Sequence, residues 1–295
     1  MQIETLKVFT DLVDLQSFSL AAERNFITQS AVSQQIRALE DKFKRKFLER
    51  VRGRREVKLT PAGDVFYREA RSVLAAYDQL QESLRGLVGK IGGTVKVSTI
   101  YSVGLHELPT KVREFMTKFP SAKIDLEYSR TTRVVRDVLN GTVELGIVAY
   151  PEPRRGLSIT PMPENRLVLV CPLGHKFASR AQVKTKDLNG QDFVLFERDV
   201  PTRKATDKIL KEHGAEVRKV AEFDNIETIK RAVEAGLGLA ILPLPAVLEA
   251  ERKGQLKIVK LVEKEWLRPI GIIHRSDRNH SVAAKKFMQL LETNG

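Results

Sequence analysis

The sequence of 295 residues lacks several features that mark common protein classes. Its one cysteine, Cys171, cannot form a disulfide within the chain, which favours a reducing interior. The neighbours of Cys171 are apolar rather than cationic, so a redox-sensing thiol is not indicated. The five histidines show no metal-ligand spacing with one another or with Cys171. The sequence therefore predicts neither a disulfide scaffold nor a metal site.

Long apolar segments are also missing. The longest uncharged apolar stretch, residues 235–248, has 14 residues and two prolines, so it is too short and too interrupted to cross a bilayer. The first residues include an early acid and no apolar core, unlike a secretory signal. We therefore expect a cytoplasmic protein without a membrane partner.

Catalytic motifs are scarce as well. The sequence contains no Gly-x-Ser-x-Gly elbow and no complete phosphate-binding loop. Residues 235–240, Ala-Gly-Leu-Gly-Leu-Ala, superficially resemble a dinucleotide loop, but they follow a predicted helix and enter a strand, which is the reverse of the required order. Gly236 is better interpreted as a helix terminator. We predict no catalytic residue, no cofactor and no enzymatic activity.

Positive charge is abundant. Fifty Lys and Arg residues against 37 Asp and Glu residues give a net charge of +13, which favours polyanionic partners. The excess is spread through the chain, but residues 42–58 hold nine basic and two acidic side chains. This local balance of +7 is more informative than the total.

Residues 18–43 have the pattern of a helix-turn-helix whose second helix begins at Gln29. One face of that helix is an apolar stripe at spacings of 4, 3 and 4, which must pack inward: Val32, Ile36, Leu39 and Phe43. The opposite face carries amides, hydroxyls and a guanidinium that can reach base edges in a major groove: Gln29, Ser30, Ser33, Gln34 and Arg37. Thr28 is placed to cap the helix and to bring its first turn to DNA. An ordinary amphipathic helix with a solvated polar side is the alternative.

The basic segment follows this helix directly. Gly53, between Val51 and Val57, suggests a short hairpin with three arginines near its tip: Arg52, Arg54 and Arg55. Such a hairpin is a wing, suited to phosphates and to the narrow minor groove. A charge run is usually only a solvated face, but its position beside a reading helix favours DNA.

Two further helices complete this part of the chain. The first, over residues 3–15, places Leu6, Phe9 and Val13 on one side, which completes a three-helix core. Thr60 caps a helix that Pro61 opens. Its apolar residues form a heptad seam: Phe66, Ala70, Val73, Tyr77, Leu80, Leu84 and Leu87. The seam predicts a homodimer, and packing on its own domain is the alternative.

Strands and helices alternate beyond residue 93, with a helix expected over 102–119 and strands over 167–171 and 269–274 among them, which predicts parallel-rich sheets with helices on both faces. Small molecules bind beyond the carboxyl ends of such strands. The candidate effector contacts at these ends are Thr99, Tyr101, Ser102, Ser129, Arg130, Thr131, Phe196 and Thr202. For the hydroxyl side chains, N-capping is an equal alternative. Nearby guanidinium groups favour an anionic effector: Arg130, Arg133, Arg198 and Arg203.

Four segments resemble the amino-terminal signature of LysR-type transcriptional regulators. They are Leu20-Ala-Ala-Glu, Thr28-Gln-Ser-Ala-Val-Ser-Gln-Gln-Ile-Arg-Ala-Leu-Glu, Phe47-Leu-Glu-Arg and Leu59-Thr-Pro-Ala-Gly. The length and the α/β pattern also match, so the resemblance spans essentially the whole chain. It implies an α+β protein with a winged helix-turn-helix (1–60), a dimerising linker helix (61–89), a hinge (90–93) and a two-lobed, periplasmic-binding-protein-like α/β effector domain (94–295).

The resemblance also implies the lobes and the partners. Lobe I would comprise residues 94–163 and 266–295, lobe II residues 164–265, with an effector cleft between them and two crossovers as a hinge. A tetramer would bend double-stranded DNA, and RNA polymerase is a further partner that we expect. The function predicted is sequence-specific transcriptional regulation controlled by a small effector. The alternative is a solute-binding or enzymatic α/β protein with a helical assembly module.

Overall fold

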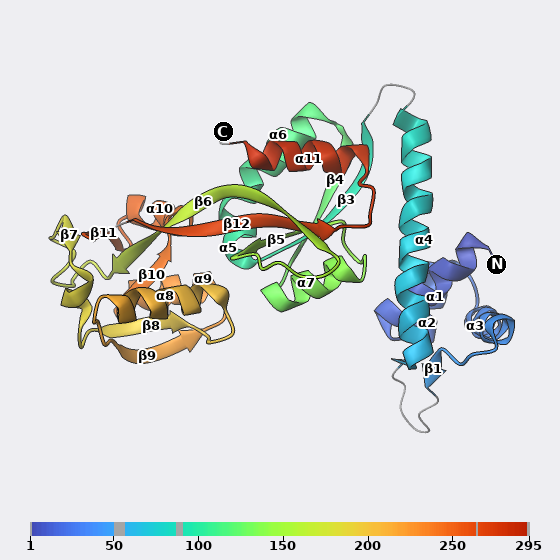
Figure 1. Ribbon diagram of the computed structural model, residues 1–295, viewed down its shortest axis with the longest axis horizontal. Helices are drawn as coiled ribbons and strands as arrows, with labels where there is room; N and C mark the ends of the chain where they lie inside the picture. Colours follow the sequence, from blue (N-terminus) through green and yellow to red (C-terminus); the bar gives the residue numbers. More distant parts are fainter. Residues whose placement is uncertain (1, 50–56, 87–90, 264, 294–295) are drawn as a thin grey trace. The chain divides into compact units, whose positions relative to one another are not determined.

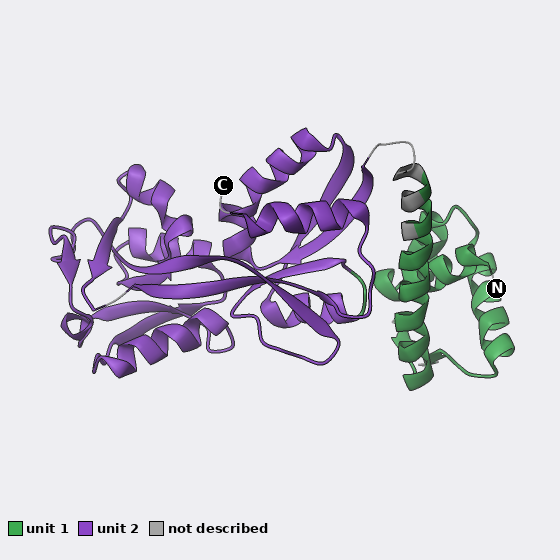
Figure 2. Ribbon diagram, turned by 45° about the horizontal axis from the view of Figure 1, so that its top comes forward, with its two compact units in different colours: residues 1–89, 140–142 green, residues 90–139, 143–295 purple. Residues whose placement is uncertain are grey.

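The computed structural model describes residues 2–49, 57–86, 91–263 and 265–293. The chain divides into two compact units, shown in different colours in Figure 2. The N-terminal unit contains residues 1–89 with 140–142, and the C-terminal unit contains residues 90–139 and 143–295. Among the described residues, no helix combines the length and the hydropathy that a membrane crossing requires.

The N-terminal unit is built from helices and one small hairpin (Figure 1). Its elements are α1 (Ile3–Leu15), α2 (Phe18–Arg24), α3 (Gln29–Phe43), β1 (Leu48–Glu49), β2 (Lys58–Leu59) and α4 (Pro61–Gly86). The predicted core is confirmed, since Leu6, Phe9 and Val32 are almost completely buried. The last member of the predicted apolar stripe of α3 is not buried, because Phe43 is 43% exposed, although its ring contacts the rings of Phe47 and Phe66.

The junction of the hairpin with α4 depends on two residues. The hydroxyl of Thr60 donates to the carbonyl of Lys46 (2.6 Å) and accepts from the backbone N–H of Gly63 (3.0 Å), so the predicted cap is confirmed. A Cβ atom at Gly63 would overlap the carbonyl oxygen of Phe47. Only glycine allows the helix to approach the preceding segment this closely.

The heptad seam of α4 has two parts. Its first members pack on their own unit, since Ala70 is buried and the ring of Phe66 stacks on Phe47. The next four side chains are 39–58% exposed: Val73, Tyr77, Leu80 and Leu84. The last member, Leu87, lies outside the described residues. Packing within the domain therefore explains only the beginning of the seam.

The C-terminal unit contains a mixed eight-stranded sheet in the order β4-β3-β5-β12-β6-β11-β7, with β10 also paired to β6, and a separate parallel pair, β8–β9. Its strands are β3 (Gly92–Thr99), β4 (Ser121–Tyr128), β5 (Leu145–Ala149), β6 (Leu157–Cys171), β7 (Gln182–Val183), β8 (Asp192–Phe196), β9 (Arg218–Phe223), β10 (Ala240–Pro243), β11 (Lys257–Leu261) and β12 (Trp266–Arg275). Its helices are α5 (Tyr101–His106), α6 (Leu108–Lys118), α7 (Thr131–Leu139), the 3₁₀ turn η1 (Thr185–Leu188), α8 (Pro201–Glu212), α9 (Ile226–Glu234), α10 (Leu244–Arg252) and α11 (Val282–Glu292).

Two long strands, β6 and β12, run side by side through the whole C-terminal unit (Figure 1). Their register shifts between Arg268 and Ile270, and Arg268 lies opposite Asn165. We call the segment of β6 and β12 around Asn165 and Arg268 the crossover. Separate buried clusters lie on the two sides of the crossover, so the unit has two lobes. Both strands are longer than the segments expected from sequence, because the residues before 167 and those flanking 269–274 also pair.

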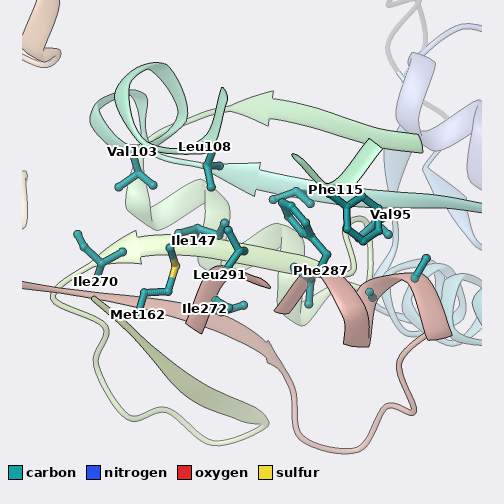
Figure 3. Packing of buried hydrophobic residues seen from close by; sticks show 14 of the residues in the cluster. Val95, Val103, Leu108, Phe115, Ile147, Met162, Ile270, Ile272, Phe287 and Leu291 are labelled. Atoms are coloured by element: carbon teal, nitrogen blue, oxygen red, sulfur yellow. The ribbon is translucent and has the colours of Figure 1, made fainter. Parts of the chain in front are cut away.

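Lobe I has a sheet between two helix layers: α6 and α11 cover one face and α7 the other (Figure 1). Figure 3 shows its core, in which Val95, Ile147 and Phe287 are completely buried. Gly92 and Gly93 belong to β3 rather than to a separate hinge. The single helix expected over 102–119 is wrong, because α5 ends at His106 and α6 begins with Pro109 in its first turn, where a missing N–H costs nothing.

Lobe II packs its strands between two buried clusters. Cys171 is completely buried at the end of β6, and burial raises the pKa of its thiol to about 11, which agrees with an unreactive core cysteine. Gly236 ends α9 with a φ of 86°, as expected of a helix terminator. Helix α10 was not expected from sequence, because prolines flank its start, but Pro245 lies in the first turn, where it is tolerated.

Candidate functional site

The outer face of α3 is exposed and its first turn is capped. The hydroxyl of Thr28 accepts from the backbone N–H of Ala31 (3.2 Å) and lies 2.9 Å from the hydroxyl of Ser30. The predicted reading residues Gln29, Ser30, Gln34 and Arg37 are exposed, and Ser33 is half-buried. The side chains predicted to reach bases therefore share one accessible helical face.

Glu40 joins α3 to the hairpin. Its carboxylate accepts hydrogen bonds from the Nζ of Lys46 (2.7 Å) and from the backbone N–H groups of Phe47 (2.9 Å) and Leu48 (3.4 Å). Burial acts to raise the pKa of Glu40, but these hydrogen bonds outweigh it and the pKa is lowered. The ionised side chain thus fixes the direction in which the chain leaves the reading helix.

The base of the predicted wing is present. Strands β1 and β2 pair antiparallel, with Leu48 opposite Leu59 and Glu49 opposite Lys58. Arg52, Arg54 and Arg55 belong to the connection between these strands and lie outside the described residues. Their role stays a prediction.

A cleft lies between the two lobes of the C-terminal unit. The carboxyl ends of β3, β4, β8 and β9 lead to it, and each is followed by the start of a helix, namely α5, α7, α8 and α9. The N-terminal ends of these four helices therefore border this space. Only three of these strand ends were identified from sequence, because the turn through Asp224 and Asn225 before α9 was overlooked.

Seven of the eight predicted effector contacts line the cleft: Tyr101, Ser102, Ser129, Arg130, Thr131, Phe196 and Thr202. Thr99 does not. Its side chain is fully buried, and its hydroxyl donates to the carbonyl of Ile147 (3.2 Å), so it holds β3 against β5 instead.

Arg268 lies in the wall of the cleft and is only 2% exposed. Its guanidinium donates from Nη2 to the hydroxyl of Ser102 (2.7 Å), from Nε to that of Thr202 (3.3 Å) and from Nη1 to Oδ1 of Asn165 (3.1 Å). Burial lowers the pKa of Arg268 to about 10, so the group still carries its charge at neutral pH.

These bonds decide the role of two hydroxyls. Ser102 and Thr202 were equally compatible with capping, but the caps of α5 and α8 are Ile100 and Val200, which have no side-chain hydrogen bond to the helix. The two hydroxyls accept from Arg268 instead. Sequence reasoning missed Arg268, although an arginine within the apolar strand Trp-Leu-Arg-Pro-Ile-Gly-Ile-Ile was a usable signal.

Three of the four arginines that sequence reasoning named are already paired with acids. Arg130 contacts Asp224 (2.8 Å), Glu197 (3.1 Å) and Asp199 (3.3 Å) at the rim of the cleft. Arg203 is buried and bonded to Glu222 and Asp207. Arg133 contacts Glu127 and Asp137, and Arg198 is not among the residues that line the cleft.

The part of the chain that the structure describes contains no group of three or more His, Cys, Asp or Glu side chains that could hold a metal ion. The loop at 236–238 has a packing role. A Cβ atom at Gly238 would come within 2.6 Å of the carbonyl oxygen of Asp192, so this glycine allows the chain to pass close to β8.

Comparison with known proteins gives matches to both units. The family model "Bacterial regulatory helix-turn-helix protein, lysR family" matches residues 3–64, and "LysR substrate binding domain" matches residues 89–295. The chain is 30% identical to the "Probable RuBisCO transcriptional regulator" of Cyanophora paradoxa, over 99% of this chain and 91% of that protein. It is also 30% identical to the protein of that name from Cyanidioschyzon merolae, over 97% of this chain and 96% of that protein.

Solved structures share the fold. A full-length OxyR variant from Pseudomonas aeruginosa has a TM-score of 0.79 at 22% identity, covering 100% of this chain and 99% of that one. CbnR complexed with its target DNA has a TM-score of 0.70 at 23% identity, covering 99% of both chains. The Synechocystis CcmR regulatory domain in complex with 2-PG has a TM-score of 0.62 at 23% identity, covering 68% of this chain and 96% of that one.

Proposed function

The chain belongs to the LysR family of transcriptional regulators, and on this basis we propose how its parts read DNA and sense an effector. It is a DNA-binding transcriptional regulator with an effector-binding domain, and it is not an enzyme. The alternative of a solute-binding or enzymatic protein with a helical assembly module is therefore wrong. As domain boundaries we propose 1–60, 61–89, 90–91 and 92–295, because Gly92 and Gly93 already belong to β3, with the lobes divided at 163/164 and 265/266.

In the DNA complex, α3 lies in the major groove. Its capped start and the side chains of Gln29, Ser30, Ser33, Gln34 and Arg37 face the base edges. Arg52, Arg54 and Arg55 hold the backbone or the minor groove from the wing. The exposed polar face of α3, on a helix otherwise anchored by buried apolar residues, is the observation that carries this assignment.

A homodimer forms through the exposed part of the α4 seam. Four apolar side chains at spacings of 4, 3 and 4 stay uncovered in the single chain, which is the pattern of a coiled-coil seam. A two-fold dimer presents its two α3 helices to half-sites about one helical turn apart, roughly 34 Å. Two dimers assemble into a tetramer that bends DNA, RNA polymerase is a further partner, and the protein acts in the cytoplasm.

The effector is a small anion bound in the cleft between the lobes. Arg268 supports this proposal, because a buried guanidinium attracts carboxylate or phosphate groups, and four helix starts add to its field. The likeness to a regulatory domain solved with 2-PG points in the same direction. The names of the relatives suggest that the regulated genes include those of RuBisCO.

The test is to sequence the fragments of sheared genomic DNA that the full-length protein retains at near-physiological salt. We expect a dyad with half-sites about one turn apart, close to RuBisCO genes. Retention without a shared motif would reduce the protein to a non-specific DNA binder, and a shared motif elsewhere would contradict only the proposed target genes. Repeating the selection with small phosphorylated acids tests whether an anion changes the retained set.

A further inference from the structure

Arg268 lies at the point where the lobes join. It belongs to β12, faces Asn165 of β6 across the crossover, and immediately precedes the register shift between the two strands. Arg268 therefore lies close to the boundary that we propose between the lobes, opposite a residue of lobe II.

The hydrogen bonds of Arg268 reach both lobes. Ser102 belongs to α5 of lobe I and Thr202 to α8 of lobe II, and both present neutral hydroxyl oxygens to the guanidinium. Among the described residues, Arg268 makes no ion pair, and its three side-chain hydrogen bonds all go to neutral oxygens. A buried cation without a bonded anion is unfavourable, and an anion supplied from the cleft would relieve this.

Glu107 provides a distant counter-charge through Asn165. The Nδ2 of Asn165 donates to Oε2 of Glu107 (3.0 Å), while its Oδ1 accepts from Arg268. In the described part of the chain, the Oε1 atom of Glu107 is buried without a hydrogen-bond partner. Asn165 thus holds an acid on one side and a guanidinium on the other, and prevents direct contact between them.

We propose that Arg268 and Asn165 form a charge-sensing crossover, in which a carboxylate or phosphate of the effector replaces Ser102 and Thr202 as the partner of Arg268. The inference rests on the proposed binding of an anion in the cleft, and it adds the residue that selects the anion and the place where binding is sensed. Releasing one hydroxyl from each lobe changes the bonds that hold the lobes together at their junction.

This arrangement predicts a defined selectivity. The planar fork of a guanidinium fits two oxygens of one carboxylate or phosphate, so neutral analogues of the same shape lose this contact. Because Glu107 opposes a second anion near the crossover, removing its charge strengthens anion binding. Placing a carboxylate at position 165 weakens anion binding, because this carboxylate forms an ion pair with Arg268 and competes with the effector.

The experiment is calorimetric titration of the full-length protein with the two acids abbreviated 2-PG, 2-phosphoglycolate and 2-phosphoglycerate, and with inorganic phosphate. We expect the Arg268→Gln variant to bind the preferred anion about 10- to 100-fold more weakly than the unsubstituted protein. Two nearly isosteric substitutions should act in opposite directions: Glu107→Gln should tighten binding about tenfold and Asn165→Asp should weaken it about tenfold.

Arg218→Gln is the matched control. It removes one positive charge at the start of β9, the end of that strand opposite the cleft, where Arg218 pairs with Asp192, so binding should change less than twofold. If the unsubstituted protein binds none of the three anions, the proposed anionic effector is wrong, and this inference with it. If it binds but Arg268→Gln and Asn165→Asp bind equally well, only the charge-sensing crossover is wrong. Should Arg268→Gln fail to fold, the opposite shifts at positions 107 and 165 still decide.

Discussion

His106 of lobe I and Glu227 of lobe II contact each other directly, with 2.7 Å between Nε2 of the histidine and Oε1 of the glutamate. Burial lowers the pKa of His106 from its usual 6.5, although the hydrogen bond with Glu227 acts in the opposite direction. The pKa of such a histidine is lower in the folded state than in the unfolded state. Its contribution to the free energy of unfolding is therefore complete above about pH 6.5, and it falls as the pH drops below that value, because the unfolded state then binds the proton more readily.

Replacing His106 by Gln should therefore flatten the pH dependence of stability. We expect the melting temperature of the unsubstituted protein to fall more steeply between pH 7.5 and 5.5 than that of His106→Gln. Some slope should remain, because burial also lowers the pKa values of His175 and His274. Thermal unfolding across this pH range is the measurement, and parallel curves for the two proteins would contradict the assignment.

Gly63→Ala should destabilise the N-terminal unit by about 1–3 kcal/mol, since the added methyl group meets the backbone carbonyl of Phe47, which cannot move aside freely. Gly174→Ala is the matched control, because a Cβ atom there meets nothing within 4 Å. Urea unfolding followed by circular dichroism would compare the two. Equal stabilities would show that the α4 start is not as tightly packed as described.

Gln34→Ala should weaken binding to the specific site by about 1–3 kcal/mol and relax the preference at one base pair, because Gln34 is proposed to bond a base edge. Affinity for random duplex DNA should stay nearly the same. Fluorescence anisotropy with operator and random duplexes measures both quantities. An equal loss on random DNA would remove Gln34 from the base-reading set.

Arg54→Ala should behave differently, because a phosphate contact carries no sequence information. We expect weaker binding to specific and random DNA alike, and a salt dependence of the logarithm of the binding constant that is less steep by about one unit. Binding measured at several salt concentrations gives this slope. A loss confined to the specific site would instead place Arg54 on a base.

Leu80→Lys should shift the protein from dimer toward monomer, since Leu80 is 56% exposed within the uncovered seam. Asp78→Lys introduces the same side chain at an exposed position that the helical period places on the other side of α4, and it should leave the dimer intact. Sedimentation velocity distinguishes the species. Two dimeric variants would move the dimer interface away from α4.

Local signals in the sequence predicted much of this structure. The bounds of α1 and α3 agree with the expected helices, because the apolar period and the Thr28 cap are encoded within a few neighbouring residues. The break at His106 was missed, since Pro109 was read as an interior residue of one long helix rather than as the first turn of a second. The full length of β6 was missed too, because it depends on pairing with β12, about a hundred residues away.

In the candidate site, too, the residues marked by local sequence signals were predicted and those brought in by distant segments were not. Ser102 and Thr202 were found because hydroxyls at strand ends are visible in the sequence, whereas their shared partner Arg268 reaches them only after the chain returns through the crossover. Thr99 was also named as a cleft residue, but it does not line the cleft. Side chains alternate between the two faces of a strand, and the hydroxyl of Thr99 is bonded to the carbonyl of Ile147.

The shared strands β6 and β12 also impose an order on folding. The core of lobe I needs Ile272 and Phe287, which follow the whole of lobe II in the chain. On the ribosome, β3, β4 and β5 therefore wait with an uncovered apolar face until β12 and α11 emerge, and contacts over such sequence separations form slowly. Interrupting synthesis after lobe II would leave a product prone to aggregation, with no effector cleft.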